Sequence, residues 1–206
     1  MVLAGKRIGW RLAGLGFALA TVVVAAAWGT YRSRALERDK QKAYLLFSGF
    51  APNYTAILVE GFEAMEADTF PAWGVFPNST AFFAGLVERC ILNGATFDLF
   101  ALPGVPPCRS AAPADFSCSN NAWCVVADYR TEWYGKDVPF LFTRNLAIDS
   151  LSEASAEALE GIAPYGKKGV LALYPDAWGC RVKFIPATDI ATAFNPLHVT
   201  NRVLRP

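Results

Sequence analysis

Residues 12–31 read LAGLGFALATVVVAAAWGTY, and no side chain in this stretch carries a charge. A run of about 20 uncharged, mostly apolar residues is the length that an α-helix needs to cross the hydrocarbon of a bilayer. We therefore predict a transmembrane helix over residues 12–31, preceded by a leader or cytoplasmic segment over residues 1–11. Basic residues flank the stretch on both sides, so positive charge does not set its orientation.

The sequence that follows favours a continuing helix. Residues 30–47 read TYRSRALERDKQKAYLLF, which contains no proline or glycine and is rich in good helix formers. We predict a helical stalk over residues 32–48, which extends the first helix to about 50 Å at 1.5 Å per residue. Gly49 and Pro52 then end the helix, because proline lacks the backbone donor and glycine eases a bend.

An alternative is a cleaved secretory signal. The chain has a basic start, then an apolar stretch, then the small residues Ala25, Ala26 and Ala27 as a cleavage site. The helix-forming sequence downstream favours retention as an anchor instead. Aromatic-rich segments broken by proline, together with clustered cysteines, are typical of exported domains, so we place residues 49–206 outside the cytoplasm.

Residues 49–206 mix helical and strand patterns. Apolar side chains at helical spacing predict helices over residues 54–67 and 78–94, and shorter ones over 151–161 and 189–194. Runs rich in β-branched and aromatic residues predict strands over 97–102, 122–127, 140–143, 170–174 and 181–185. The last two strands form an antiparallel hairpin through the link over 175–179. The predicted fold is an α+β domain with a small, mainly antiparallel sheet behind a long N-terminal helix.

The sequence carries no recognisable catalytic or nucleotide-binding motif. GxSxG, the P-loop and a GxGxxG after a strand are all missing. The only histidine, His198, lies eight residues before a C-terminus that we expect to be loosely held, which is a poor position for a general base. The 19 basic and 18 acidic residues nearly cancel and give no field that attracts nucleic acid. We expect no enzyme, no cofactor and no nucleic-acid partner.

Five cysteines and one histidine do not show the spacing of a zinc site. Outside the cytoplasm a disulfide is plausible, and Cys108 with Cys118 is the best candidate, since it would close a short loop. Sequence alone leaves the pairing open. The alternative for Cys90, Cys124 and Cys180 is that they are small buried residues.

Two further groups of side chains are candidates for binding. The loop carboxylates do not form the dense cluster that calcium needs, so we interpret them as exposed carboxylates without metal: Asp115, Asp128, Asp137 and Asp149. Four aromatic residues are either a sugar- or peptide-binding face or core packing, and we favour packing: Trp123, Trp133, Tyr134 and Trp178.

A family resemblance adds to these observations. The string Gly16-Phe17-Ala18-Leu19-Ala20-Thr21 is similar to the prepilin peptidase site of type IV pilins and type II secretion pseudopilins. The resemblance implies that Gly16 ends a leader and Phe17 begins the mature chain. Thr21 stands at the fifth mature position, where the family usually has glutamate. The strings over 76–83, 121–125 and 138–145 resemble large pilin-like proteins of the Verrucomicrobia and Lentisphaerae group.

The resemblance implies a structural role as a subunit or minor component of a pilus or secretion pseudopilus. Its partners would be the membrane and like subunits, packed through the N-terminal helix. Within such a bundle, Gly14, Ala18 and Ala25 would allow close approach of helices. The alternatives are a membrane-tethered binding domain that uses the loop around Cys108 and Cys118, or an accessory subunit of a membrane complex.

Overall fold

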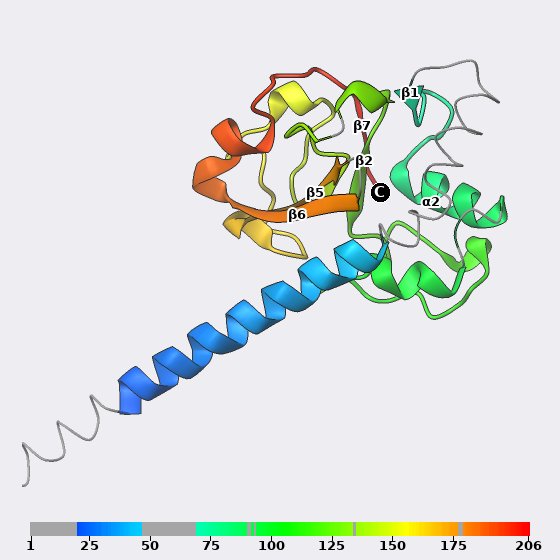
Figure 1. Ribbon diagram of the computed structural model, residues 1–206. Helices are drawn as coiled ribbons and strands as arrows, with labels where there is room; N and C mark the ends of the chain where they lie inside the picture. Colours follow the sequence, from blue (N-terminus) through cyan, green and yellow to red (C-terminus); the bar gives the residue numbers. More distant parts are fainter. Residues whose placement is uncertain (1–19, 47–68, 90–91, 93, 134, 177–178) are drawn as a thin grey trace, which may run out of the picture. The chain divides into compact units, whose positions relative to one another are not determined.

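The computed structural model describes residues 20–46, 69–89, 92, 94–133, 135–176 and 179–206. The chain divides into two compact units, Met1–Asp39 and Lys40–Pro206. An α-helix runs through the described residues 20–46 (Figure 1). The predicted helix over residues 54–67 lies outside the described residues.

The α+β class is confirmed, with an N-terminal helix and a small antiparallel sheet. The sheet has five strands in the order β6-β5-β4-β2-β7, and β1 and β3 form a separate two-stranded pair. Every strand pair is antiparallel. The elements after the first helix are β1 (Thr69–Phe70), α2 (Ser79–Glu88), η1 (Gly94–Phe100), η2 (Pro113–Asp115), β2 (Trp123–Val126), β3 (Tyr129–Arg130), η3 (Thr131–Trp133), β4 (Leu141–Thr143), η4 (Leu151–Glu153), η5 (Gly166–Lys168), β5 (Gly169–Asp176), β6 (Gly179–Pro186), η6 (Ala187–Asp189), η7 (Ile190–Phe194) and β7 (Val203–Leu204).

The β5–β6 hairpin is the longest strand pair and was predicted. Its register runs from Gly169 opposite Pro186 to Asp176 opposite Gly179. Seven of the eight residues of β5 are buried, because β5 lies inside the sheet between β4 and β6. The strands predicted over residues 122–127 and 140–143 are also present, as β2 and β4.

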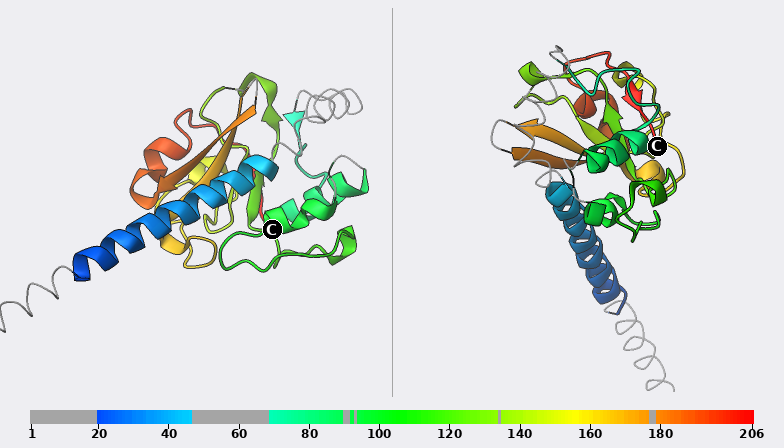
Figure 2. Two further views of the ribbon diagram at one scale, coloured as in Figure 1. Left: turned by 60° about the horizontal axis from the view of Figure 1, so that its bottom comes forward. Right: turned by 90° about the vertical axis from the view of Figure 1, so that its right-hand side faces the viewer.

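Helix α2 begins where the sequence indicated. The side chain of its N-cap, Asn78, accepts a hydrogen bond from the backbone N–H of Ala81, and Phe82, Phe83 and Leu86 are buried. The helix ends at Glu88, earlier than predicted. Figure 2 shows α2 together with the 3₁₀ segments η1 and η2 beyond the β2 and β7 side of the sheet, away from the β5–β6 hairpin.

The strand predicted over residues 97–102 was wrong, because residues 94–100 form the 3₁₀ helix η1. A strand would point Phe97 and Phe100, three residues apart, to opposite faces, whereas a 3₁₀ turn places them on one face. Both rings are fully buried, with Phe100 4.3 Å from the ring of Phe83 and Phe97 4.4 Å from that of Phe116. Tertiary packing of the aromatic rings therefore overrides the local strand propensity.

Two expectations about the C-terminal third are also corrected. The helix predicted over residues 151–161 was wrong. These residues contain only the 3₁₀ turn η4, since Leu151 is buried and Leu159 pairs with Leu146 as a β-bridge.

The prediction of a loosely held C-terminal segment was also wrong. Strand β7 pairs with β2 along the sheet edge, and the backbone N–H of Ser79 donates to the carbonyl of Arg205. The C-terminus therefore lies at the start of α2 (Figure 1).

Candidate functional site

The first candidate region is the uncharged part of the N-terminal helix. All residues from 20 to 34 are exposed in the structure, including Val22, Val23, Val24 and Trp28, which are each at least 60% exposed. A helix that is apolar on every face is normally covered by protein or lipid. Within the described part of the chain, no helix combines the length and the apolarity that crossing a bilayer requires. Residues 12–19 of the predicted span lie outside the described residues.

Small residues on this helix leave space for a neighbour. Ala25 is exposed, and a Cβ built on Gly29, four residues later, would meet nothing within 4 Å. Positions four residues apart lie on the same helix face. The predicted processing residues Gly16 and Phe17 lie outside the described residues, as do two of the predicted packing residues, Gly14 and Ala18.

The predicted disulfide between Cys108 and Cys118 is not formed, and both are free thiols. Cys108 is buried, and its sulfur lies 3.6 Å from the carbonyl oxygens of Ser110 and Asp115, whereas Cys118 is exposed. The loop is held by polar contacts instead: Arg144 donates to the carbonyl of Cys118 at 2.9 Å and to that of Asn121 at 3.0 Å. The binding role of the loop around Cys108 and Cys118 stays a prediction.

The aromatic residues named from the sequence do not form one exposed face. Trp123 is fully buried in β2 and Trp133 is 9% exposed, which agrees with core packing. Tyr134 and Trp178 lie outside the described residues. The loop carboxylates are also separate, and the described residues contain no group of three or more side chains suited to a metal ion. Asp137 instead pairs with Arg181 and Lys183, both at 2.9 Å.

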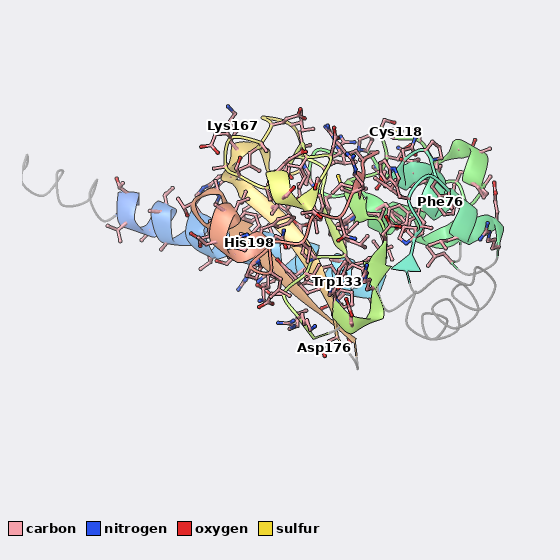
Figure 3. The ribbon with its side chains drawn as sticks, turned by 90° about the horizontal axis from the view of Figure 1, so that it is seen from above. Phe76, Cys118, Trp133, Lys167, Asp176 and His198 are labelled. Carbon is pink, nitrogen blue, oxygen red and sulfur yellow. The ribbon has the colours of Figure 1, made fainter. Side chains whose placement is uncertain are left out.

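The structure contains a groove that was not predicted from the sequence. It has a volume of about 530 Å³ and is lined by Asp128, Arg130, Trp133 and residues 197–202. We call it the Asp128 groove. One wall is the turn between β2 and β3, and the other is the segment that leads into β7. Figure 3 shows Trp133 and His198, one from each wall, well away from Cys118.

Hydrogen bonds hold the two walls of the Asp128 groove together. The side-chain amide of Asn201 donates to the carbonyls of Ala127 at 2.8 Å and Asp128 at 2.9 Å. The backbone N–H of Ala127 donates to the carbonyl of Arg202 at 2.9 Å. On the outer side, the carbonyl of Thr200 accepts from the hydroxyl of Ser150 at 2.9 Å. The groove is therefore formed by ordered backbone on both sides.

Two residues of the groove have an uncommon backbone conformation. Asp128 and His198 both have φ of 51°, and no other non-glycine residue in the described ranges has a positive φ. This left-handed conformation is unfavourable for most side chains, although aspartate, asparagine and histidine adopt it more often than others. Such positions cluster at functional sites. Two hydrogen bonds fix the turn at Asp128. Its backbone N–H donates to the carbonyl oxygen of Pro71, and its carboxylate accepts from the backbone N–H of Trp73 at 2.9 Å.

Two arginine side chains are backed by tryptophan rings at the groove. The guanidinium carbon of Arg130 lies 5.9 Å from the ring centroid of Trp133, and that of Arg202 lies 5.8 Å from that of Trp73. Stacking on an aromatic face limits the guanidinium to fewer orientations and leaves its N–H edge available. Sequence reasoning missed both arginines, because only the tertiary pairing of β2 with β7 brings residues 128–133 and 197–202 together.

No protein-family model, curated protein or solved structure matches this chain.

Proposed function

We propose that the chain is a membrane-anchored structural subunit, or minor component, of a pilus-type or secretion pseudopilus-type filament. In this proposal the N-terminal helix anchors the protein in the membrane and packs against helices of like subunits, while the α+β domain lies outside the cytoplasm. The proposal rests on the resemblance at Gly16 and Phe17 and on one structural observation, the exposed apolar helix.

That observation is that every residue from 20 to 31 is exposed, in a helical stretch without one charged side chain. In water this surface would be unfavourable by roughly 25 cal/mol for each Å² of apolar area. Lipid or neighbouring apolar helices remove that cost. The small residues Ala25 and Gly29 on one face favour helices over lipid alone, because they let two backbones approach closely.

The last part of the helix, residues 40–46, belongs to the second unit. Within that unit Ala43 and Leu46 are buried, and the ammonium group of Lys42 donates to the carbonyl of Ala101 at 3.3 Å. These contacts make residues 40–46 of the helix part of the folded second unit.

Assembly can be tested with a matched pair of variants. Ala25→Leu fills the small-residue face, whereas Ala27→Leu adds the same side chain about 200° around the helix. We expect cross-linked oligomers of the full chain in native membranes to be lost in Ala25→Leu and retained in Ala27→Leu. Equal oligomer yields in the two variants and the original chain would contradict packing through this face.

Processing gives a second test that does not depend on assembly. Intact-mass measurement and N-terminal sequencing of the protein from its native membrane should show a chain that begins at Phe17. A chain that begins at Met1 would contradict pilin-type processing. A chain that begins at Trp28 would show a cleaved secretory signal and contradict the membrane anchor.

The alternative function is a membrane-tethered binding domain. The Asp128 groove is the observation that favours it, whereas the loop around Cys108 and Cys118 does not. A tethered binding domain would tolerate Ala25→Leu without loss of function, so the same variant separates the two proposals.

A further inference from the structure

We infer that the Asp128 groove binds an acidic saccharide, with a uronate carboxylate held between Arg130 and Arg202 and sugar hydroxyls on Asp128 and the 197–202 segment. The inference goes beyond the proposed function, because it does not depend on how the N-terminal helix packs.

The charges of the groove favour an anionic group on the ligand. Arg202 makes no ion pair within the described residues, and the one acidic partner of Arg130 there, Glu132, lies 3.5 Å away. Both side chains of that pair are more than half exposed, so the pair is weak and a ligand can replace it. Guanidinium groups bind carboxylates through two parallel N–H donors, which gives orientation as well as affinity.

The acceptors of the groove favour a ligand that also carries hydroxyl groups. Asp128 uses one carboxylate oxygen, Oδ1, to accept from Trp73 N–H. No described residue donates to its second oxygen, and sulfate offers this oxygen no hydrogen-bond donor. A hydroxylated ligand satisfies it, since each sugar hydroxyl can donate one hydrogen bond. A carboxylate beside several hydroxyls is the pattern of a uronic acid.

The size and the apolar lining fit a short sugar chain. The groove volume of about 530 Å³ is within the range of roughly 300–1,000 Å³ that small-ligand sites occupy. Leu197 is 50% exposed at the groove, and Val199 is half-buried beside it. These side chains offer an apolar surface to the C–H face of a sugar ring. Because both walls are already hydrogen-bonded in place, little ordering cost is expected on binding.

The test is isothermal titration calorimetry on the full chain in detergent micelles, with three probes. The first is trigalacturonate, the second is the same trisaccharide with its carboxylates reduced to alcohols, and the third is inorganic sulfate. We expect binding of trigalacturonate that weakens with salt, and binding of the other two at least tenfold weaker. Equal affinity for the reduced sugar or for sulfate, or no binding of trigalacturonate, would overturn the inference.

Variants locate the site. Arg202→Gln and Arg130→Gln should each weaken trigalacturonate binding about tenfold or more, since each removes charge-assisted hydrogen bonds. Arg109→Gln removes an exposed arginine outside the groove and should leave affinity unchanged. A loss as large in Arg109→Gln would show non-specific charge attraction and refute the site. Ala25→Leu should retain full affinity, so failure of helix assembly and failure of saccharide binding are measured separately.

Discussion

The side-chain amide of Asn201 donates a hydrogen bond to the main-chain carbonyl of Asp128 over 2.9 Å. The two residues are 73 positions apart in the chain, and the bond joins the segment before β7 to the turn after β2. Both residues line the Asp128 groove, which also contains His198, the second left-handed non-glycine residue in the described ranges. The same amide donates to the carbonyl of Ala127, so one side chain satisfies two backbone carbonyls of the turn.

Asn201→Ala should lower both stability and groove binding. The substitution removes the donor of two hydrogen bonds to partly buried carbonyls, so we expect a loss of about 1–3 kcal/mol in the free energy of unfolding. Thermal unfolding of the full chain in micelles measures it. Thr200→Ala, the exposed neighbour whose carbonyl makes the contact to Ser150, is the control and should change little. Equal melting temperatures for the two variants would contradict the role of Asn201.

Gly169→Ala should be among the most destabilising single substitutions in the sheet. Gly169 has φ of 145°, and a Cβ there would lie 2.2 Å from the carbonyl oxygen of Ile185 on β6. The hairpin backbone would have to separate, at a cost of several kcal/mol. Gly161→Ala is the control, since its Cβ meets nothing within 4 Å and alanine reduces unfolded-state entropy. Denaturant titration should show a large loss for Gly169→Ala and none for Gly161→Ala.

Asp137 should make stability depend on pH at the acidic end. The hydrogen bond from Lys183, with the nearby charges of Lys183 and Arg181, lowers the pKa of Asp137 despite partial burial. A pKa lowered in the folded state adds stability above the unfolded value of about 3.9 and loses it as pH falls through the folded value. Because Asp137 is 42% exposed, solvent screening limits the effect to less than about 1 kcal/mol.

The corresponding measurement compares Asp137→Asn with the original chain at pH 7 and at pH 2.5. The difference in unfolding free energy should be largest at pH 7 and should shrink as the pH falls to 2.5, because protonation of the original carboxylate removes its ion pairs. Glu88→Gln removes an exposed carboxylate that forms no ion pair within the described ranges, and should show no such change. A difference that persists unchanged at pH 2.5 would exclude ion pairing as its cause.

The described cysteines should differ sharply in reactivity. Cys118 is exposed, whereas burial raises the pKa of Cys124 to about 12 and that of Cys180 to about 12. Thiolate is the reactive form, so Cys124 and Cys180 should be almost inert at pH 8. Iodoacetamide followed by peptide mass mapping should label Cys118 first, without prior reduction. Labelling of Cys118 only after reduction would show a disulfide and contradict the free thiol.

The hairpin, the start of α2 and the strands β2 and β4 were predictable because their signals are local. Asn78 caps a helix within three residues, and the alternating, β-rich runs around residues 170–185 pair through a short link. The sequence did not predict the end of α2 correctly. The strand predicted over 97–102 was wrong because aromatic packing of Phe97 and Phe100 decides that segment. The helix predicted over 151–161 was wrong because Leu159 pairs with Leu146 across the chain.

The sequence by itself determined the uncharged run at the N-terminus, the α+β class and the absence of catalytic motifs, because each depends on composition or on spacing within one segment. Only the tertiary structure decided that the C-terminal segment is a sheet strand, that Cys108 and Cys118 are free thiols, and that Arg130 and Arg202 share a groove. The physical reason is sequence separation. Contacts between β2 and β7 form across more than 70 residues, and no local pattern at either end specifies its partner.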